Sequence, residues 1–399
     1  MSTSKAGLLG NGWRGPQLHT TLVLILALGL RIAVASQSKG SNDVVLWEQF
    51  AREIDAHGLM QTYVRQTWFN HPPLMGWMMW GQYRLALALD LPFSVLMKVP
   101  AILADLVVLL LVSSELRSSR TIALLIALCP LPLLISAHHG NTDSLCAGLA
   151  LASFVMFRRT RYTLGALLLG MALNVKLIPI VLVPVAAICV PLRYWPKSAL
   201  ALGLALAPFA IPFASVPEAF YRNAFAYKSI VAPWGINFFA LPAAAEHPAL
   251  HAALKEWVLP FAKNAIILGS VVWAAIAFLA GRWTLWQRAF LPMAMFLVLA
   301  PGFGVQYLIY PFSFLLLASP RHGLEYGFVA GLYAFTAYAF YWTGTLPALS
   351  WFNPQWGLVA QGVGLIAWYV LARAAVSVVA TAHPYATESG EPKARFHRG

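Results

Sequence analysis

Apolar runs of roughly 14–22 residues recur from end to end of this chain, and they limit the folds open to it. About 20 consecutive apolar residues are needed for a helix to cross a bilayer. A soluble core cannot take up so many runs, and only 10% of the residues are charged, against about 25% in soluble domains. The sequence therefore predicts an all-α, polytopic helical membrane protein.

Twelve spans are expected within a single membrane domain, residues 18–380. They are predicted at 18–36, 95–113, 121–137, 144–157, 162–174, 176–192, 198–214, 263–281, 288–300, 307–319, 323–343 and 357–378. The first run lacks a clear small-x-small cleavage site, so we expect a retained helix rather than a signal peptide. The flanking segments, 1–17 and 381–399, are predicted to be cytoplasmic tails, the second of them disordered.

Short basic clusters between the apolar runs predict the orientation of the chain. They are Arg117/Arg120, Arg158/Arg159/Arg161, Arg193/Lys197, Arg282/Arg288 and Arg321. The positive-inside rule assigns all of them to the cytoplasm. This requires the segment 73–90, which carries Trp and Tyr, to lie along the outer surface as an interfacial helix. The first outer loop, 37–94, and a second long outer loop, 215–262, then face outside.

The same orientation predicts a functional cavity on the outer face, because the polar and acidic loops collect there. The net charge of +13 is an orientation signal in such a protein, and no nucleic-acid partner is expected. The compact loops favour the inner membrane of a bacterium, with the active site facing outside.

Asp43, within KGSNDVVLWEQF, follows the first span by a few residues and is expected at the membrane surface. Partial desolvation there is expected to raise its pKa toward the range of a general base. The alternative is an N-cap for the helix that begins near Val44. Glu48, Glu53 and Asp55 are predicted to form the wet face of that helix.

Cations near the outer ends of apolar runs are candidate phosphate ligands. Lys98 and Asp105 lie seven residues apart on one helix face, and Arg31 has a depth similar to that of Lys98. Charges inside a membrane usually face a cavity or a partner. Lys98 and Arg31 either neutralise a lipid phosphate or snorkel to the interface. Lys176, the only charge of its hairpin, is either an interfacial anchor or a phosphate ligand.

Polar residues also gather in the turn HHGNTDS, which carries His138, His139, Asn141 and Asp143. Two histidines and an aspartate suggest a metal. Adjacent histidines rarely ligate one ion together, however, and no second ligand pair is evident. Hydrogen bonding to a polyol is therefore favoured, and a divalent metal is not expected.

Two further outer segments contain candidate binding residues. His71, in NHPPL, either bonds a sugar or phosphate or belongs to a plain turn formed by the two prolines. Gln306 and Tyr307, in FGVQYLIYPF, are predicted at the outer boundary of a span. In isolation, this second segment has the composition of an ordinary aromatic belt.

In their order along the chain, these motifs resemble the GT-C superfamily of membrane glycosyltransferases, which use polyprenyl-phosphate sugars. The resemblance covers roughly residues 18–320. It rests on Asp43, a Trp/Gly/Tyr stretch ending in PPL at 72–74, KVPAILADL, HGNTD, NVKLIPIVLVP and VQYLIYPF. The sequence is most similar to the branch of glucosyltransferases and polyprenol-phosphate mannosyltransferases.

The resemblance implies inverting transfer of a hexose from a polyprenyl-phosphate donor to an acceptor on the extracytoplasmic face. Asp43 would be the catalytic base, and Lys98, Lys176 or both would hold the donor phosphate. The sugar and acceptor pocket would be lined by His138, His139, Asn141, Asp143, Gln306 and Tyr307. Many family members carry a second acidic residue beside the first. Here Asn42 and Val44 flank Asp43, which favours a metal-independent mechanism.

The expected partners are membrane lipid, a lipid-linked sugar donor and a glycan or other acceptor. A transporter or flippase of a lipid-linked sugar is the alternative function, and a non-catalytic member of an envelope assembly complex is a third. Transporters often show internal repeats with broken helices in matching halves. No convincing repeat is found, and the polar residues are predicted to cluster at one face rather than at the midplane.

Overall fold

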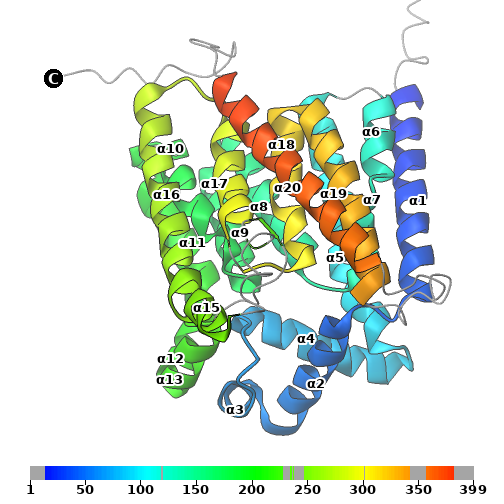
Figure 1. The fold of residues 1–399 in the computed structure, drawn as a ribbon, viewed down its shortest axis with the longest axis vertical. Coiled ribbons are helices and arrows are strands. Elements are labelled where there is room, and N and C mark those ends of the chain that lie inside the picture. Colours follow the sequence, from blue (N-terminus) through cyan, green and yellow to red (C-terminus); the bar gives the residue numbers. More distant parts are fainter. Residues whose placement is uncertain are drawn as a thin grey trace, which may run out of the picture.

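The fold is a bundle of long helices with shorter helices packed across one end (Figure 1). The computed structural model describes residues 14–117, 120–227, 234–235, 237, 247–300, 302–341 and 356–381. These residues form helices and no β-strand, so the predicted all-α class is confirmed for the described chain. The predicted tails fall largely on 1–13 and 382–399, which lie outside the described residues.

Helices occur at each of the twelve predicted ranges. They are α1 (Arg14–Gln37), α5 (Phe93–Leu116), α6 (Arg120–Ala127) with α7 (Pro130–Leu133) and η1 (Leu134–His139), α8 (Asp143–Arg158), α9 (Tyr162–Val175), η2 (Ile178–Leu182) with α10 (Val183–Cys189), η3 (Leu192–Tyr194) with α11 (Trp195–Leu206), η4 (Ala207–Phe209) and α12 (Ala210–Ser215), α16 (Leu259–Ala280), α17 (Leu285–Leu299), η7 (Val305–Leu308) with α18 (Ile309–Ala318), α19 (Pro320–Tyr341) and α20 (Trp356–Ala380).

Six helical stretches in the described residues are long and apolar enough to cross a membrane by length and composition. They are His19–Gln37, Phe93–Leu116, Arg120–His139, Leu192–Ser215, Glu256–Ala280 and Val359–Ala380. Their outer surfaces carry large apolar side chains that the bundle leaves exposed, such as Ile25, Leu103, Leu200, Leu268 and Val376. Contiguous apolar surface of this extent marks contact with lipid or a partner. The chain is therefore a polytopic, membrane-embedded helical protein.

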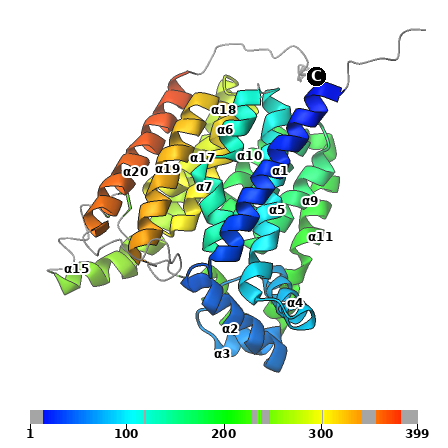
Figure 2. The same ribbon diagram turned by 90° about the vertical axis from the view of Figure 1, so that its right-hand side faces the viewer.

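The two ends of the bundle differ in structure (Figures 1 and 2). The first described residues of α1 and the last of α20 lie at one end. At the other end lie α2 (Asn42–His57), α3 (Leu59–Arg65) and α4 (Pro73–Leu89), which come from the predicted first outer loop. Helix α4 corresponds to the predicted interfacial segment 73–90, and it packs against α2 beyond the long helices.

The described part of the second long loop lies at the same end as α2–α4. It forms α13 (Pro217–Phe220), η5 (Tyr221–Phe225), α15 (Pro248–Ala253) and η6 (Leu254–Val258). The Asn223 side-chain amide donates to the carbonyl oxygens of Tyr63 at 2.8 Å and Gln66 at 3.0 Å. These bonds join the two long loops into one layer.

A buried ion pair joins three helices within the bundle. Arg31 Nε lies 3.2 Å from Asp105 Oδ2, and the two side chains are only 2% and 3% exposed. Arg31 Nη1 also donates to the carbonyl oxygens of Ala27 and Ala127. The pair therefore ties α1 to α5 and to the end of α6. Removing one partner of a buried pair leaves an uncompensated charge in a medium of low dielectric constant.

We expect Asp105→Asn to lower the free energy of unfolding by about 3–5 kcal/mol, because it leaves the Arg31 guanidinium buried and unpaired. Asp55→Asn is the matched control, since Asp55 pairs with an Arg84 side chain that is 60% exposed. Its loss should cost about 0–1 kcal/mol. SDS-induced unfolding of the purified protein measures both changes, and equal losses would contradict this account.

Candidate functional site

A joint between the start of α2 and the turn after η1 forms the centre of the candidate site. The backbone N–H and the hydroxyl of Ser41 both donate to the carbonyl oxygen of His139, at 3.1 Å and 3.0 Å. Gly140 follows with a φ of +74°, and a Cβ there would lie 2.6 Å from Val44 Cγ2. Only glycine allows this close approach without displacing Val44.

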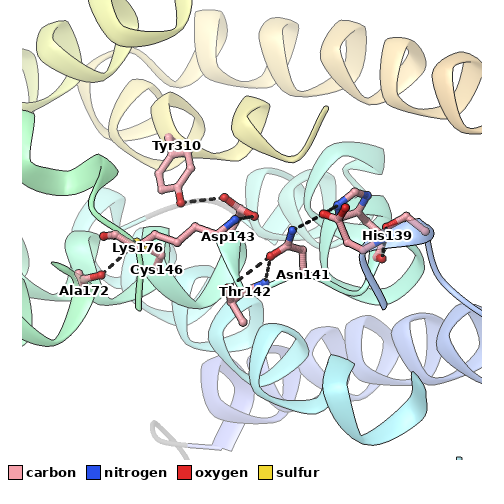
Figure 3. A network of polar contacts seen from close by, with 10 residues as sticks. His139, Asn141, Thr142, Asp143, Cys146, Ala172, Lys176 and Tyr310 are labelled. Atoms are coloured by element: carbon pink, nitrogen blue, oxygen red, sulfur yellow. Dashed lines mark hydrogen bonds and ion pairs between the residues drawn. The ribbon is translucent and has the colours of Figure 1, made fainter. Parts of the chain in front are cut away.

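The joint places the Asp43 carboxylate beside two donors from the same turn. His139 Nε2 lies 3.1 Å from Asp43 Oδ2, and Asn141 Nδ2 donates to the same oxygen at 2.6 Å. The side-chain Oδ1 of Asn141 accepts a hydrogen bond from the Thr142 backbone N–H, which orients the side-chain amide (Figure 3). The Asp43 side chain stays 32% exposed, whereas that of His139 is 2% exposed.

The N-cap of α2 is Ser41, so the alternative role considered for Asp43 is wrong. The Ser41 hydroxyl accepts the backbone N–H of Asp43, and the helix begins at Asn42. Asp43 therefore lies in the first turn, with its carboxylate free to face His139 and Asn141.

The pKa of Asp43 is lowered to about 2, which corrects the expected rise. Burial acts to raise this pKa, but it is outweighed by the hydrogen bond and charge of His139, the charge of Lys176 and the hydrogen bond from Asn141. The partial burial of Asp43 was predicted from the sequence, but the hydrogen bonds from His139 and Asn141 were not. Asp43 is consequently a carboxylate at every physiological pH.

A second ion pair lies in the same turn as Asn141. Lys176 Nζ lies 2.6 Å from Asp143 Oδ2, and the Tyr310 hydroxyl donates to Asp143 Oδ1 at 2.8 Å (Figure 3). The Asp143 side chain is fully buried and that of Lys176 is 12% exposed. The Lys176 ammonium also lies 5.9 Å from the Tyr307 ring centroid. The lysine is thus held in one position, with part of its surface open.

His71 belongs to an aromatic group that lines this end of the bundle. Its ring centroid is 4.2 Å from that of Trp47, and its carbonyl oxygen accepts the Tyr63 hydroxyl at 2.7 Å. Burial and the charge of Lys176 lower the pKa of His71 to about 3, despite the opposing charge of Asp43. His71 is therefore a neutral imidazole packed among aromatic side chains.

Two cations predicted as phosphate ligands form their contacts with other parts of the protein. Lys98 is fully buried, and its ammonium donates to the carbonyl oxygens of Ala35 and Ser38 at the end of α1. Arg31 pairs with Asp105 within the bundle. These contacts give both cations protein partners within the bundle. The predicted contacts of Lys98 and Arg31 with a donor phosphate stay predictions.

His138 contacts Ser38 and Tyr338 rather than Asp43. Its Nδ1 lies 2.7 Å from the Ser38 hydroxyl, and its ring packs edge-on against Tyr338 at 4.8 Å. The side chain is fully buried. His138 therefore supports the turn. Its buried position does not favour the predicted direct contact with a sugar.

Gln306 and Tyr307 are neighbours in sequence, but their side chains contact different residues. Tyr307 lies over Lys176, as described above, and also packs against Phe296 at 5.8 Å. The Gln306 amide instead folds over Gly304, where an added Cβ would lie 2.7 Å from Oε1. Tyr307 thus belongs to the site, and Gln306 stands at its margin.

Two tyrosines of the site were missed in the sequence. Tyr310 is fully buried and is the hydroxyl donor to Asp143. It lies three residues after Tyr307, a spacing that places both on one helix face and could have revealed it. Tyr338 packs against the His139 ring at 5.5 Å. It comes from an apolar helix whose sequence holds no comparable signal.

The wet face predicted for α2 is occupied by ion pairs. Glu48 pairs with Arg52, Glu53 with Arg65 and Asp55 with Arg84. None of these acids contacts Asp43 in the described structure. No group of three or more metal-ligating side chains that could hold an ion occurs among the described residues.

Comparisons with known proteins do not assign a function to this chain, so its proposed function rests on the site. No protein-family model matches the sequence, and a search of curated proteins found no match either.

We expect stability to fall as the pH drops below about 6.5, because the unfolded chain then binds a proton at His71 that the folded chain excludes until about pH 3. The decrease due to this residue is at most about 1.4 kcal/mol per pH unit. His71→Phe should remove that part of the slope, measured by thermal unfolding between pH 7.5 and 5.5.

Trp47→Phe is the control, because it alters the same ring contact without removing a titratable group. It should shift stability equally at both pH values. An unchanged slope in His71→Phe would show that His71 is not held neutral in the folded protein.

Proposed function

We propose that this protein is an integral-membrane glycosyltransferase of the GT-C type, which transfers a hexose from a polyprenyl-phosphate donor with inversion. One observation carries the proposal. A partly exposed carboxylate, Asp43, is oriented by His139 and Asn141 at the end of the bundle, and the Lys176–Asp143 pair is held by the neighbouring turn. A base and a fixed cation at a membrane surface suit a lipid-phosphate sugar donor.

Asp43 would accept the proton of the acceptor hydroxyl. As the acceptor oxygen bonds to the anomeric carbon, the bond from that carbon to the phosphate oxygen breaks, and the proton passes to the carboxylate. A carboxylate with a pKa of about 2 is a weak base for a free hydroxyl. The proton therefore moves late, once the new bond has made the hydroxyl acidic. His139 and Asn141 keep the accepting group ionised and oriented.

Lys176 would stabilise the phosphate that leaves. Its ammonium is held by a fully buried Asp143, and Asp143 is held in turn by Tyr310. A preorganised cation stabilises developing negative charge without having to reorient during the reaction. The polyprenyl chain would lie against the apolar helix surfaces while the sugar reaches Asp43.

The proposed setting is the inner membrane of a bacterium. All twelve helical segments would cross the bilayer, with both termini in the cytoplasm and α2–α4 on the outer surface. The alternation of helix ends supports this, since α1 begins and α20 ends at the end of the bundle opposite α2, the helix that carries Asp43 (Figure 1). Glu115 pairs with Arg158 and Arg159, which joins the basic ends of α5 and α8.

Asp43→Asn should lower the rate of sugar transfer by about 10²- to 10⁴-fold, because it removes the proton acceptor and keeps the shape of the side chain. The measurement is transfer of labelled hexose by membranes that contain equal amounts of each protein. Glu48→Gln, on the exposed side of the same helix, is the control and should retain full activity.

Undiminished transfer by Asp43→Asn would reject Asp43 as the base. Movement of the labelled lipid across the membrane without any transfer would favour a transporter of lipid-linked sugar instead.

A further inference from the structure

A polar hollow lies between the start of α19 and the last turns of α20. These helix ends lie at the end of the bundle opposite α2 (Figure 1). Its volume is about 430 Å³, and it is lined by Arg321, His322, Glu325, Arg373 and Ser377. This volume lies within the range of roughly 300–1,000 Å³ that small-ligand sites occupy. None of these residues belongs to the site described above.

The hollow carries uncompensated positive charge. Glu325 forms an ion pair with Arg373, whose side chain is 42% exposed. His322 Nδ1 lies 2.9 Å from the Ser319 hydroxyl. Arg321 makes no hydrogen bond or ion pair with any residue that the structure describes. The described residues that line the hollow therefore include two guanidinium groups and one carboxylate, and that carboxylate pairs with Arg373 alone. This leaves a net positive charge among them that an anion could neutralise.

The start of α19 gives a second reason to expect an anion. Helix N-termini carry a partial positive charge and favour acidic side chains in the first turn. The first turn of α19 contains no acidic residue, and Arg321 and His322 occupy it instead. Cations at this position repel the helix dipole unless a negative group lies between them.

Apolar surface next to the hollow points to a lipid rather than a soluble anion. Val376, beside Ser377 on α20, is 71% exposed, and Tyr369 on the same helix is 59% exposed. Phe328, three residues after Glu325 on α19, is 40% exposed. An acyl chain could lie along these side chains while its phosphate entered the hollow. Basic pockets between membrane helices on the cytoplasmic side bind anionic headgroups in this way.

We propose that the hollow between α19 and α20 binds the phosphate of an anionic phospholipid headgroup, with Arg321 and Arg373 as its ligands. This site is separate from the Asp43 site and does not depend on the proposed transferase activity. Its assignment to the cytoplasmic leaflet follows the orientation proposed above, but the binding test is independent of orientation.

The test uses the full chain in nanodiscs of phosphatidylcholine with increasing fractions of phosphatidylglycerol. The readout is the rise in the thermal unfolding temperature of the protein. The compared quantity is the phosphatidylglycerol fraction at which this rise reaches half of its maximum. Arg321→Gln should raise that fraction about fivefold, the contribution of one cation near anionic lipid. Glu325→Gln should lower it, because Glu325 is the only acidic residue among the described residues that line the hollow.

Arg120→Gln is the matched control, since Arg120 is an exposed arginine at the start of α6, at the same end of the bundle. Arg120→Gln should raise the phosphatidylglycerol fraction less than Arg321→Gln does, because it removes the general attraction of one surface cation but no ligand of the hollow. Equal increases in the two variants would overturn the proposal. Arg321→Gln with an unchanged titration would overturn the proposal. Inorganic phosphate, added to phosphatidylcholine nanodiscs, should give no rise, and a rise equal to that from the lipid would overturn the lipid assignment in favour of a soluble phosphate.

Discussion

The hydrogen bonds from Ser41 to the carbonyl oxygen of His139 hold the candidate site together. They fix the start of α2 against the turn that connects η1 to α8. Asp43 lies two residues after Ser41, and Asn141 lies two residues after His139, so this joint brings the two side chains into contact. Asp143 lies two residues after Asn141 in the same turn, and its carboxylate pairs with Lys176. One short segment thereby aligns a carboxylate and a cation.

Much of this cluster could be predicted from charge and order in the sequence. The basic clusters assigned the loop after α1, the HHGNTDS turn and the Lys176 turn to one side, and contacts among these three segments confirm that they meet. The pairing within the cluster could not be predicted. It depends on the wide π-helical turn of η1 and on the left-handed Gly140, which together set where each side chain of the turn points.

The two remaining cations show the limit of reasoning from depth alone. The sequence indicates that Arg31 and Lys98 lie near the outer ends of helices, but it does not identify their partners. A membrane offers little water to satisfy carbonyl groups at a helix end. Lys98 fulfils that need at the end of α1, and Arg31 neutralises Asp105 within the bundle. Both charges therefore stabilise the scaffold on which the site is built. Lys176 is the cation of the three whose charge acts on Asp43.

The most direct test of the proposed function is the reaction of the unaltered protein. Membranes that contain the chain would be supplied with labelled polyprenyl-phosphate hexoses and a lipid-linked glycan acceptor fraction. The account predicts that label leaves the polyprenyl phosphate and enters a product whose anomeric configuration, determined by NMR, is opposite to that of the donor. Transfer with retained configuration, or no transfer from any polyprenyl-phosphate hexose, would contradict it.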